Sequence, residues 1–153
     1  MNGKFDFQRF LDAQASDNKG PSSATASYAD ALNEIRAGRK RTHWIWYVFP
    51  ILRGQGSSSM SLRYAISGLG EARAYLADPV LGARLTEITR ALLEWQGSDP
   101  AEVMGYDAYK LHQCMTLFAL ASGDDRSVFE RVLDKYFEGR KEPTTLELLK
   151  RRP

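Results

Sequence analysis

Two acid-proline pairs, Asp78-Pro79 and Asp99-Pro100, constrain the fold of this chain more than any other feature. An aspartate accepts hydrogen bonds from the free N–H groups at a helix start, and proline fits the first turn because its missing donor is not needed there. Apolar residues follow the first pair at the helical period, so we expect a long helix beginning at Asp78. The second pair predicts a short helix that ends near Gly105.

The remaining punctuation by serine, aspartate and glycine also separates helical segments, and the sequence contains neither a run of alternating strands nor an Asn-Gly hairpin turn. It therefore predicts an all-α fold: one compact domain over residues 1–153, with about six to eight helices, several of them short, and an internal linker at 15–26. The further expected helices are Phe5–Gln14, Tyr28–Ala37, Met60–Ala77, Tyr109–Leu120, Ser127–Glu138 and a last one opened by a capping box at Thr144-Thr145-Leu146-Glu147. We expect His43–Phe49 to be a short buried segment, and Pro50 limits how far it can continue as a regular helix.

Composition narrows the class of protein. The chain is 43% hydrophobic and 11% aromatic, which argues against disorder. Its single cysteine, Cys114, excludes an intrachain disulfide and favours a reducing compartment. Because no apolar run approaches the roughly 20 residues that span a bilayer, and Met1–Phe10 lacks the apolar core of a secretion signal, we expect a cytoplasmic protein without a membrane contact.

Positive charge gathers in one window. Ile35–Gly70 contains no acidic residue but six cationic side chains and one histidine: Arg36, Arg39, Lys40, Arg41, Arg53, Arg63 and His43. Such a window favours a bound anion, with paired arginine donors for phosphate and the neighbouring Trp44 or Trp46 for stacking. The plainer interpretation is preferred for Arg39–Arg41, because cations are common at helix C-termini and aromatic residues commonly fill the core.

The loop from Arg53 to Ser59 is the second candidate feature. Its glycines permit close backbone approach, and a serine-capped helix start directs free N–H groups at an anion. The loop matches neither the phosphate-binding pattern G-x-x-x-x-G-K-[ST] nor G-x-S-x-G. Ligand binding and a plain connection are therefore equally compatible with it.

Few residues are available for catalysis. His43 and Asp107 are the candidates for acid-base chemistry, whereas His112 is interpreted as a half-buried, hydrogen-bonded histidine and Cys114 as a small buried hydrophobe. The sequence has neither H-E-x-x-H nor paired Cys-x-x-Cys, so we predict no metal site. Asp107 and Lys110 have the spacing of a local ion pair.

Many ordered stretches resemble a bacterial family called domain of unknown function 1810. The resemblance implies a mainly α-helical domain and supplies no established activity. It covers nearly the whole chain and rests on Ala31-Leu32, Gly38-Arg39-Lys40, His43–Pro50, Tyr64-Ala65-Ile66, Glu71–Leu76, Pro79–Leu85, Lys110-Leu111, Met115–Phe118 and Leu133–Phe137.

The chain departs from that family pattern at Ile51, at Gln55 and at His112-Gln113-Cys114. If these positions line a shared pocket, the ligand of this chain need not share the family's chemistry.

Three functions stay open. The leading hypothesis is a helical domain that binds a small phosphorylated or nucleotide-like anion at a basic and aromatic pocket. The alternatives are a hydrolase or transferase of a nucleotide-like metabolite, and a protein- or nucleic-acid-interaction module. A net charge of +2 makes nucleic acid the weakest partner. Cofactor, substrate and oligomeric state are left open. The predicted pocket residues are His43, Trp44, Trp46, Arg53, Ser57, Ser58, Ser59, Arg63 and Lys110.

Overall fold

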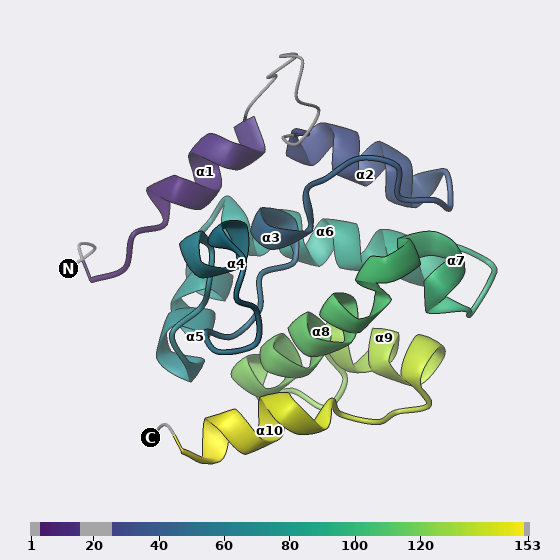
Figure 1. Ribbon diagram of the computed structural model, residues 1–153. Coiled ribbons are helices and arrows are strands. Elements are labelled where there is room, and N and C mark those ends of the chain that lie inside the picture. Colours follow the sequence, from purple (N-terminus) through teal and green to yellow (C-terminus); the bar gives the residue numbers. More distant parts are fainter. Residues whose placement is uncertain (1–3, 16–25, 152–153) are drawn as a thin grey trace.

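The computed structural model describes residues 4–15 and 26–151, and every regular element within them is helical (Figure 1). The linker expected at 15–26 lies outside the described residues, apart from its two end residues. The prediction of an all-α fold is confirmed.

Seven helices in the described ranges have eight residues or more. They are α1 (Gln8–Ala15), α2 (Tyr28–Arg36), α5 (Leu69–Ala77), α6 (Leu81–Glu94), α8 (Ala108–Ser122), α9 (Val128–Phe137) and α10 (Pro143–Lys150). Shorter helices join them: α3 (Ile45–Val48), α4 (Ser59–Arg63), α7 (Pro100–Met104) and the 3-10 turn η1 (Gly105–Asp107).

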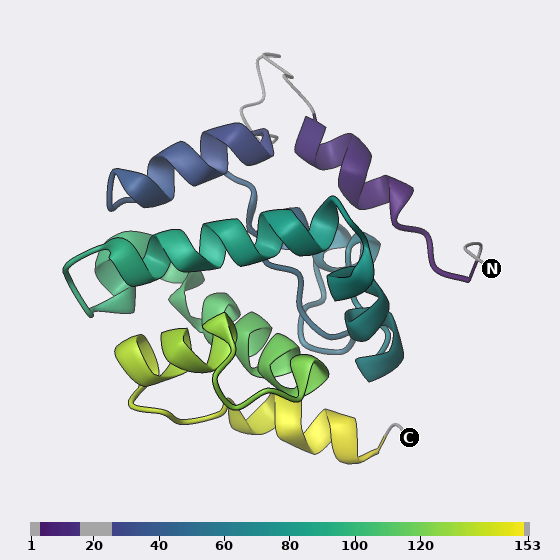
Figure 2. The same ribbon diagram turned by 180° about the vertical axis from the view of Figure 1, so that it is seen from behind.

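Helix α8 lies at the centre and contacts α5, α7, α9 and α10, while α6 contacts α2, α5 and α9. In Figures 1 and 2, α1 and α2 lie at one end of the molecule and α10 at the other. Helix α8 is buried on several sides and supplies fully buried Leu111, Met115, Leu117 and Phe118. In the ranges that the structure describes, no helix has the length and apolar character needed to cross a bilayer.

Side chains cap several of the helix starts. Ser27 forms a capping box with Asp30, and the side chain of Ser127 accepts from the N–H of Glu130. Asp99 accepts from the N–H of Ala101 at the start of α7. Asp78 accepts from the N–H groups of two following residues, but regular helix α6 begins only at Leu81.

The single helix expected over Met60–Ala77 is wrong. Helix α4 ends at Arg63 and α5 begins at Leu69, with an extended segment between them. There the N–H of Ile66 donates to the Ile51 carbonyl at 2.9 Å, and the N–H of Arg53 donates to the Ile66 carbonyl at 2.8 Å. Pairing with a distant segment therefore replaces local helical hydrogen bonds.

The cap predicted at Thr144 for the last helix is also wrong. Helix α10 begins at Pro143, and Glu142 is its N-cap, accepting from the N–H groups of Thr144 and Thr145. Glu142-Pro143 is the same acid-proline signal that located the starts near Asp78 and Asp99. The two threonines lie inside the first turn.

Candidate functional site

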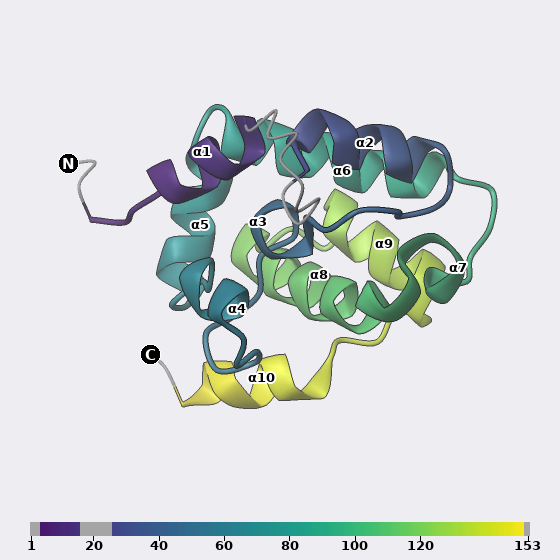
Figure 3. The ribbon, with the colours of Figure 1, turned by 45° about the horizontal axis from the view of Figure 1, so that its top comes forward.

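The turn Arg53-Gly54-Gln55 follows the aromatic run and separates two hollows in the surface. Gly54 has a φ of 102°, a conformation that side-chain-bearing residues rarely adopt, and the N–H of Gln55 donates to the Leu52 carbonyl at 3.2 Å. Gln55 also hydrogen-bonds to Thr144 and Thr145, which holds this loop beside α10 (Figure 3). Arg53 thus lines one hollow, and Gly54 and Gln55 line the other.

The first hollow, which we call the basic hollow, has a volume of about 430 Å³. It brings together two predicted residues, Arg53 and Arg63, with residues from the N-terminal segment and the start of α5. Its lining consists of Lys4, Phe5, Asp6, Arg9, Arg53, Arg63, Ser67 and Glu71.

Arg9 and Glu71 compensate each other inside the basic hollow. Their side chains lie 3.3 Å apart, and the Arg9 guanidinium also donates to the Arg63 and Ala65 carbonyls at 2.8 and 2.9 Å. Glu71 accepts the N–H of Ser67 at 2.8 Å, which places its carboxylate at the N-terminus of α5. The remaining charged side chains are three cations and Asp6, so the hollow keeps a positive excess.

The second hollow, which we call the α10 hollow, lies between α8, α10 and the turn and has a volume of about 370 Å³. It is lined by Gly54, Gln55, Tyr109, Gln113, Thr144, Glu147, Leu148 and Arg151. Of the positions at which we expected this chain to depart from the family pattern, Gln55 and Gln113 line this hollow, whereas Ile51, His112 and Cys114 do not.

A buried carboxylate lies behind the α10 hollow. Glu142 has no exposed surface and accepts from the hydroxyls of Tyr109 at 2.7 Å and Thr145 at 2.6 Å. The Thr144 hydroxyl and the Gln55 amide add bonds at 2.8 and 3.2 Å. Neutral donors therefore satisfy this charge.

Those donors keep Glu142 ionised. Burial acts to raise the pKa of Glu142, but hydrogen bonds from Thr145, Tyr109 and Thr144 outweigh it and hold the pKa at about 2. The same contact with Glu142 raises the pKa of Tyr109. A carboxylate this acidic, with its lone pairs occupied, does not suit a general base.

The aromatic residues predicted for the pocket do not reach either hollow. Trp44 is fully buried, and its indole N–H donates to Glu34 at 2.9 Å, so its ring is unavailable to a ligand. Trp46 is half-buried against Tyr47, with ring centroids 6.4 Å apart. His43 is exposed on the approach to α3 and lines neither hollow.

The predicted serines belong to the start of α4 and line neither hollow. Ser57, Ser58 and Ser59 are exposed, and Ser58 accepts from the N–H of Ser61. The bond from Ser61 to Ser58 is the N-cap of α4, a helix of only five residues, and this structural role is enough to explain it. The shared pocket predicted from the sequence is thus divided, and Arg53 and Arg63 are the members that meet.

Lys110 and the catalytic candidate Asp107 lie together elsewhere. Asp107 is 2.9 Å from the Lys40 ammonium and 3.8 Å from that of Lys110, and the Lys40 nitrogen lies 4.8 Å from the Trp44 ring centroid. Two cations therefore neutralise Asp107, and neither Asp107 nor His43 lines the basic hollow. A hydrolase or transferase activity based on them stays a prediction that this placement does not favour.

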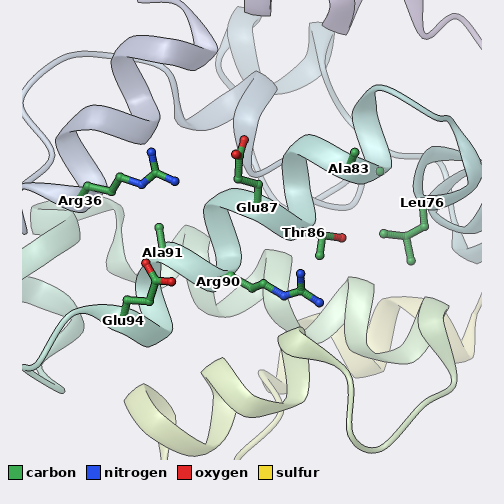
Figure 4. Close-up of a pocket in the computed structure, with 9 residues that line it drawn as sticks. Arg36, Leu76, Ala83, Thr86, Glu87, Arg90, Ala91 and Glu94 are labelled. Carbon is green, nitrogen blue, oxygen red and sulfur yellow. The ribbon is translucent and has the colours of Figure 1, made fainter.

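A further hollow of about 610 Å³ runs along the outer face of α6 (Figure 4). Arg36 extends from α2 and Leu76 comes from α5, while the other labelled side chains belong to α6. Its charges balance, since it is lined by Arg36 and Arg90 together with Glu87 and Glu94. Glu87 also accepts the Tyr28 hydroxyl at 2.6 Å. We therefore prefer the basic hollow for an anion.

Metal binding has no support in the part of the chain that the structure describes, where no group of three histidine, cysteine or carboxylate side chains could hold an ion. Cys114 is buried, which raises its thiol pKa and opposes nucleophilic chemistry. The half-buried His112 lies 2.8 Å from the Arg140 carbonyl and stacks on Phe137 with centroids 4.1 Å apart, as its interpretation as a hydrogen-bonded residue requires.

Sequence reasoning missed the residues that complete both hollows. Lys4, Arg9 and Glu71 join the basic hollow from segments far from Arg53, and no spacing rule links them. Glu142 had a usable signal, because an acid directly precedes Pro143. Its contact with Tyr109, 33 residues away, had none.

Comparison with known proteins gives a family and one close structural relative. Residues 4–149 match the family model described as "Protein of unknown function (DUF1810)". The crystal structure of the conserved hypothetical protein Rv1873 from Mycobacterium tuberculosis, at 1.38 Å, is similar with a TM-score of 0.84 and 44% sequence identity, covering 95% of this chain and 97% of that chain. A search of curated proteins gave no match.

Proposed function

Because this chain belongs to the DUF1810 family, whose description assigns no activity, we propose from geometry and charge that the domain binds a small phosphorylated anion in the basic hollow. The observation that carries the proposal is the meeting of Arg53 and Arg63 in one hollow with Lys4 and Arg9. Arginine presents planar, paired N–H donors that match phosphate oxygens.

The arrangement of the hollow supports this ligand class in two further ways. Arg9 already holds Glu71, so that carboxylate is compensated before a ligand arrives. Phe5 supplies an aromatic side chain at the edge of the hollow, with the Lys4 ammonium 5.3 Å from its ring centroid. A nucleotide-like ligand would therefore stack on Phe5 rather than on the buried Trp44.

Titration with inorganic phosphate, followed by NMR, tests the proposal. Saturable shifts are expected for the backbone amides of Arg53, Arg63 and Ser67. R53Q and R63Q should each weaken binding by roughly tenfold, since a charge-assisted hydrogen bond contributes about 1.5 to 3 kcal/mol. Raising the salt concentration should weaken binding further.

The matched control is R39Q. Arg39 belongs to the same acid-free window and is exposed, but it does not line the basic hollow. R39Q should bind phosphate as the wild type does. Equal losses in R39Q and R53Q would show that phosphate responds only to the general charge of the chain, and would remove the site.

A further inference from the structure

A larger hollow of about 710 Å³ adjoins the basic hollow on the side of the N-terminal segment. We call it the apolar hollow, because most of the side chains around it are apolar. These are Phe5, Phe7, Leu11, Ala74, Ala77 and Pro79. Lys4, Phe5 and Asp6 line both hollows, so the two hollows meet at the segment that precedes α1.

Helix α5 forms a common wall of the two hollows. Glu71 lines the basic hollow, whereas Ala74 and Ala77 line the apolar hollow. Residues three apart on a helix are neighbours on its surface, so the hollows follow each other along one side of α5. This wall changes from a carboxylate near the start of the helix to methyl groups near its end. A ligand lying along α5 would therefore pass from charged to apolar surroundings.

Aromatic packing forms the opposite wall. The ring of Phe7 lies edge-on to that of buried Tyr75, with centroids 5.9 Å apart, and the Phe5 ring stacks on Phe7 at 5.9 Å. Tyr75 belongs to α5, so these contacts hold the N-terminal segment against that helix. Phe5, Phe7 and Leu11 nevertheless stay partly exposed. A ligand that covers them removes apolar surface from water, which favours binding.

The charges of the apolar hollow lie where a second anionic group would gain little. Lys4 is the one cation among the described residues that line it, and Lys4 and Asp6 stand at the boundary with the basic hollow. The Asp78 carboxylate accepts from the N–H groups of Val80 and Leu81 at 3.1 and 2.9 Å. The two hollows together thus match a ligand that is anionic at one end and apolar at the other.

We propose that the basic and apolar hollows together bind one amphiphilic phosphate monoester, with its phosphate on Arg53 and Arg63 and its alkyl or aryl body against Phe5, Phe7 and Ala77. This proposal rests on the phosphate site proposed above and names the class of its ligand. The volume of the apolar hollow suits the body of a small molecule. Because walls from the N-terminal segment and α5 flank that body, the expected ligand is a free monoester rather than a lipid in a bilayer.

A series of probes with the same phosphate and a growing tail tests the proposal: inorganic phosphate, ethyl phosphate, butyl phosphate and hexyl phosphate, titrated at neutral pH into the full chain. Affinity should rise about twofold for each added methylene, since full burial of a methylene is worth roughly fourfold and these partly exposed walls bury it incompletely. Hexanol, which lacks the anchoring phosphate, should bind at least about tenfold more weakly than hexyl phosphate.

NMR locates the two ends of the ligand in the same titrations. The backbone amides of Arg53 and Arg63 should shift with every phosphate probe, whereas those of Ala74 and Ala77 should shift with hexyl phosphate and not with inorganic phosphate. R53Q should weaken the binding of inorganic phosphate and of hexyl phosphate by the same factor, because both use the same anchor.

A77Q places a long polar side chain at an exposed position that lines the apolar hollow only. It should remove the dependence of affinity on tail length and leave the binding of inorganic phosphate unchanged. The matched control is A83Q, because Ala83 is an exposed helical alanine that lines neither hollow. A83Q should keep the full dependence on tail length.

The outcomes separate this proposal from the one on which it rests. Phosphate binding at Arg53 and Arg63 with equal affinity for all four phosphate probes would overturn the amphiphilic ligand and leave the phosphate site standing. No response of these arginines to any phosphate probe would remove both. An unchanged tail-length dependence in A77Q, or binding to phosphatidate vesicles without a response to soluble hexyl phosphate, would also overturn the proposal.

Discussion

The basic hollow and the α10 hollow lie on either side of one turn and each has a buried glutamate beside it, yet the two glutamates are compensated in different ways. Glu71 is satisfied by the Arg9 guanidinium and the Ser67 N–H, so its charge is cancelled within the hollow. Glu142 is satisfied by neutral hydroxyl, amide and N–H donors, so its charge persists. A cation thus compensates one buried carboxylate, and neutral donors satisfy the other.

The residues of the two hollows also differ in how much they should contribute to the stability of the fold. In the basic hollow, Lys4, Arg53 and Arg63 lie at the surface or near it, and the fold does not depend on them alone. In the α10 hollow, one carboxylate joins α8, α10 and the turn through Tyr109, Thr145 and Gln55. Substitutions at the two hollows should consequently change the free energy of unfolding by different amounts.

The largest expected effect is that of E142Q. The neutral amide cannot accept from all the donors that meet at Glu142, and its own N–H groups would face them. We expect the free energy of unfolding to fall by about 3 kcal/mol, the usual cost of breaking a buried, hydrogen-bonded charge. Urea denaturation measures it.

E147Q is the control for that comparison, because it removes the exposed glutamate of the same helix. Its effect on the free energy of unfolding should stay within about 0.5 kcal/mol. Similar losses in E142Q and E147Q would contradict the role of Glu142 as the centre of the network.

Lowering the pH should remove the stabilisation by Glu142 without a mutation. The pKa of Glu142 is about 2 in the fold and 4.5 in the reference state. Because the folded value is the lower one, its stabilisation is present above pH 4.5 and disappears as pH falls towards 2, amounting to roughly 3 kcal/mol. The gap in unfolding free energy between wild type and E142Q should therefore narrow from pH 6 to pH 3. A constant gap would show that ionisation of Glu142 does not stabilise the fold.

G54A tests whether the shared turn positions both hollows. Gly54 has a φ of 102°, a conformation that is strained for alanine, and such strain costs about 1 to 2 kcal/mol. Phosphate binding should weaken as well. The comparison variant is G68A: Gly68 has an extended φ of 170° with open space around its Cβ position, so a change of only about 0.5 kcal/mol is expected. Equal losses would show that Gly54 has no special role.

E71Q should change stability less than E142Q does and should change binding more clearly. Loss of the partly buried ion pair with Arg9 should cost about 1 kcal/mol. Removing the carboxylate from the basic hollow should strengthen phosphate binding roughly threefold, as NMR titration can show. Weaker binding would mean that Glu71 acts mainly by holding Arg9 in position.

Local rules predicted much of this fold from a few residues. Asp99 and Ser27 cap helices as expected, because a cap is a contact within three residues. The aromatic run is largely buried as expected, with Trp44, Tyr47 and Phe49 inaccessible. The helix over Met60–Ala77 failed because its middle pairs with residues near Leu52 instead of with itself.

The acid-free window shows the same limit at the candidate site. Its two bounding acids, Glu34 and Glu71, turn back onto the chain: Glu34 accepts from the N–H groups of Arg41 and Thr42 and from the Trp44 indole. Burial acts to raise the pKa of Glu34, but these hydrogen bonds outweigh it, so the pKa is lowered overall. Charge counting located the window but not these contacts.

The sequence by itself determined the helical class, most helix ends and the excess of cations between Glu34 and Glu71, because each follows from composition or from bonds between near neighbours. The tertiary structure alone decided that Arg53 meets Arg63 and Arg9, that Trp44 is sealed by Glu34, and that Glu142 collects donors from α8, α10 and the turn. Contacts across such separations depend on how helices pack, and packing is set by the whole core rather than by any local spacing.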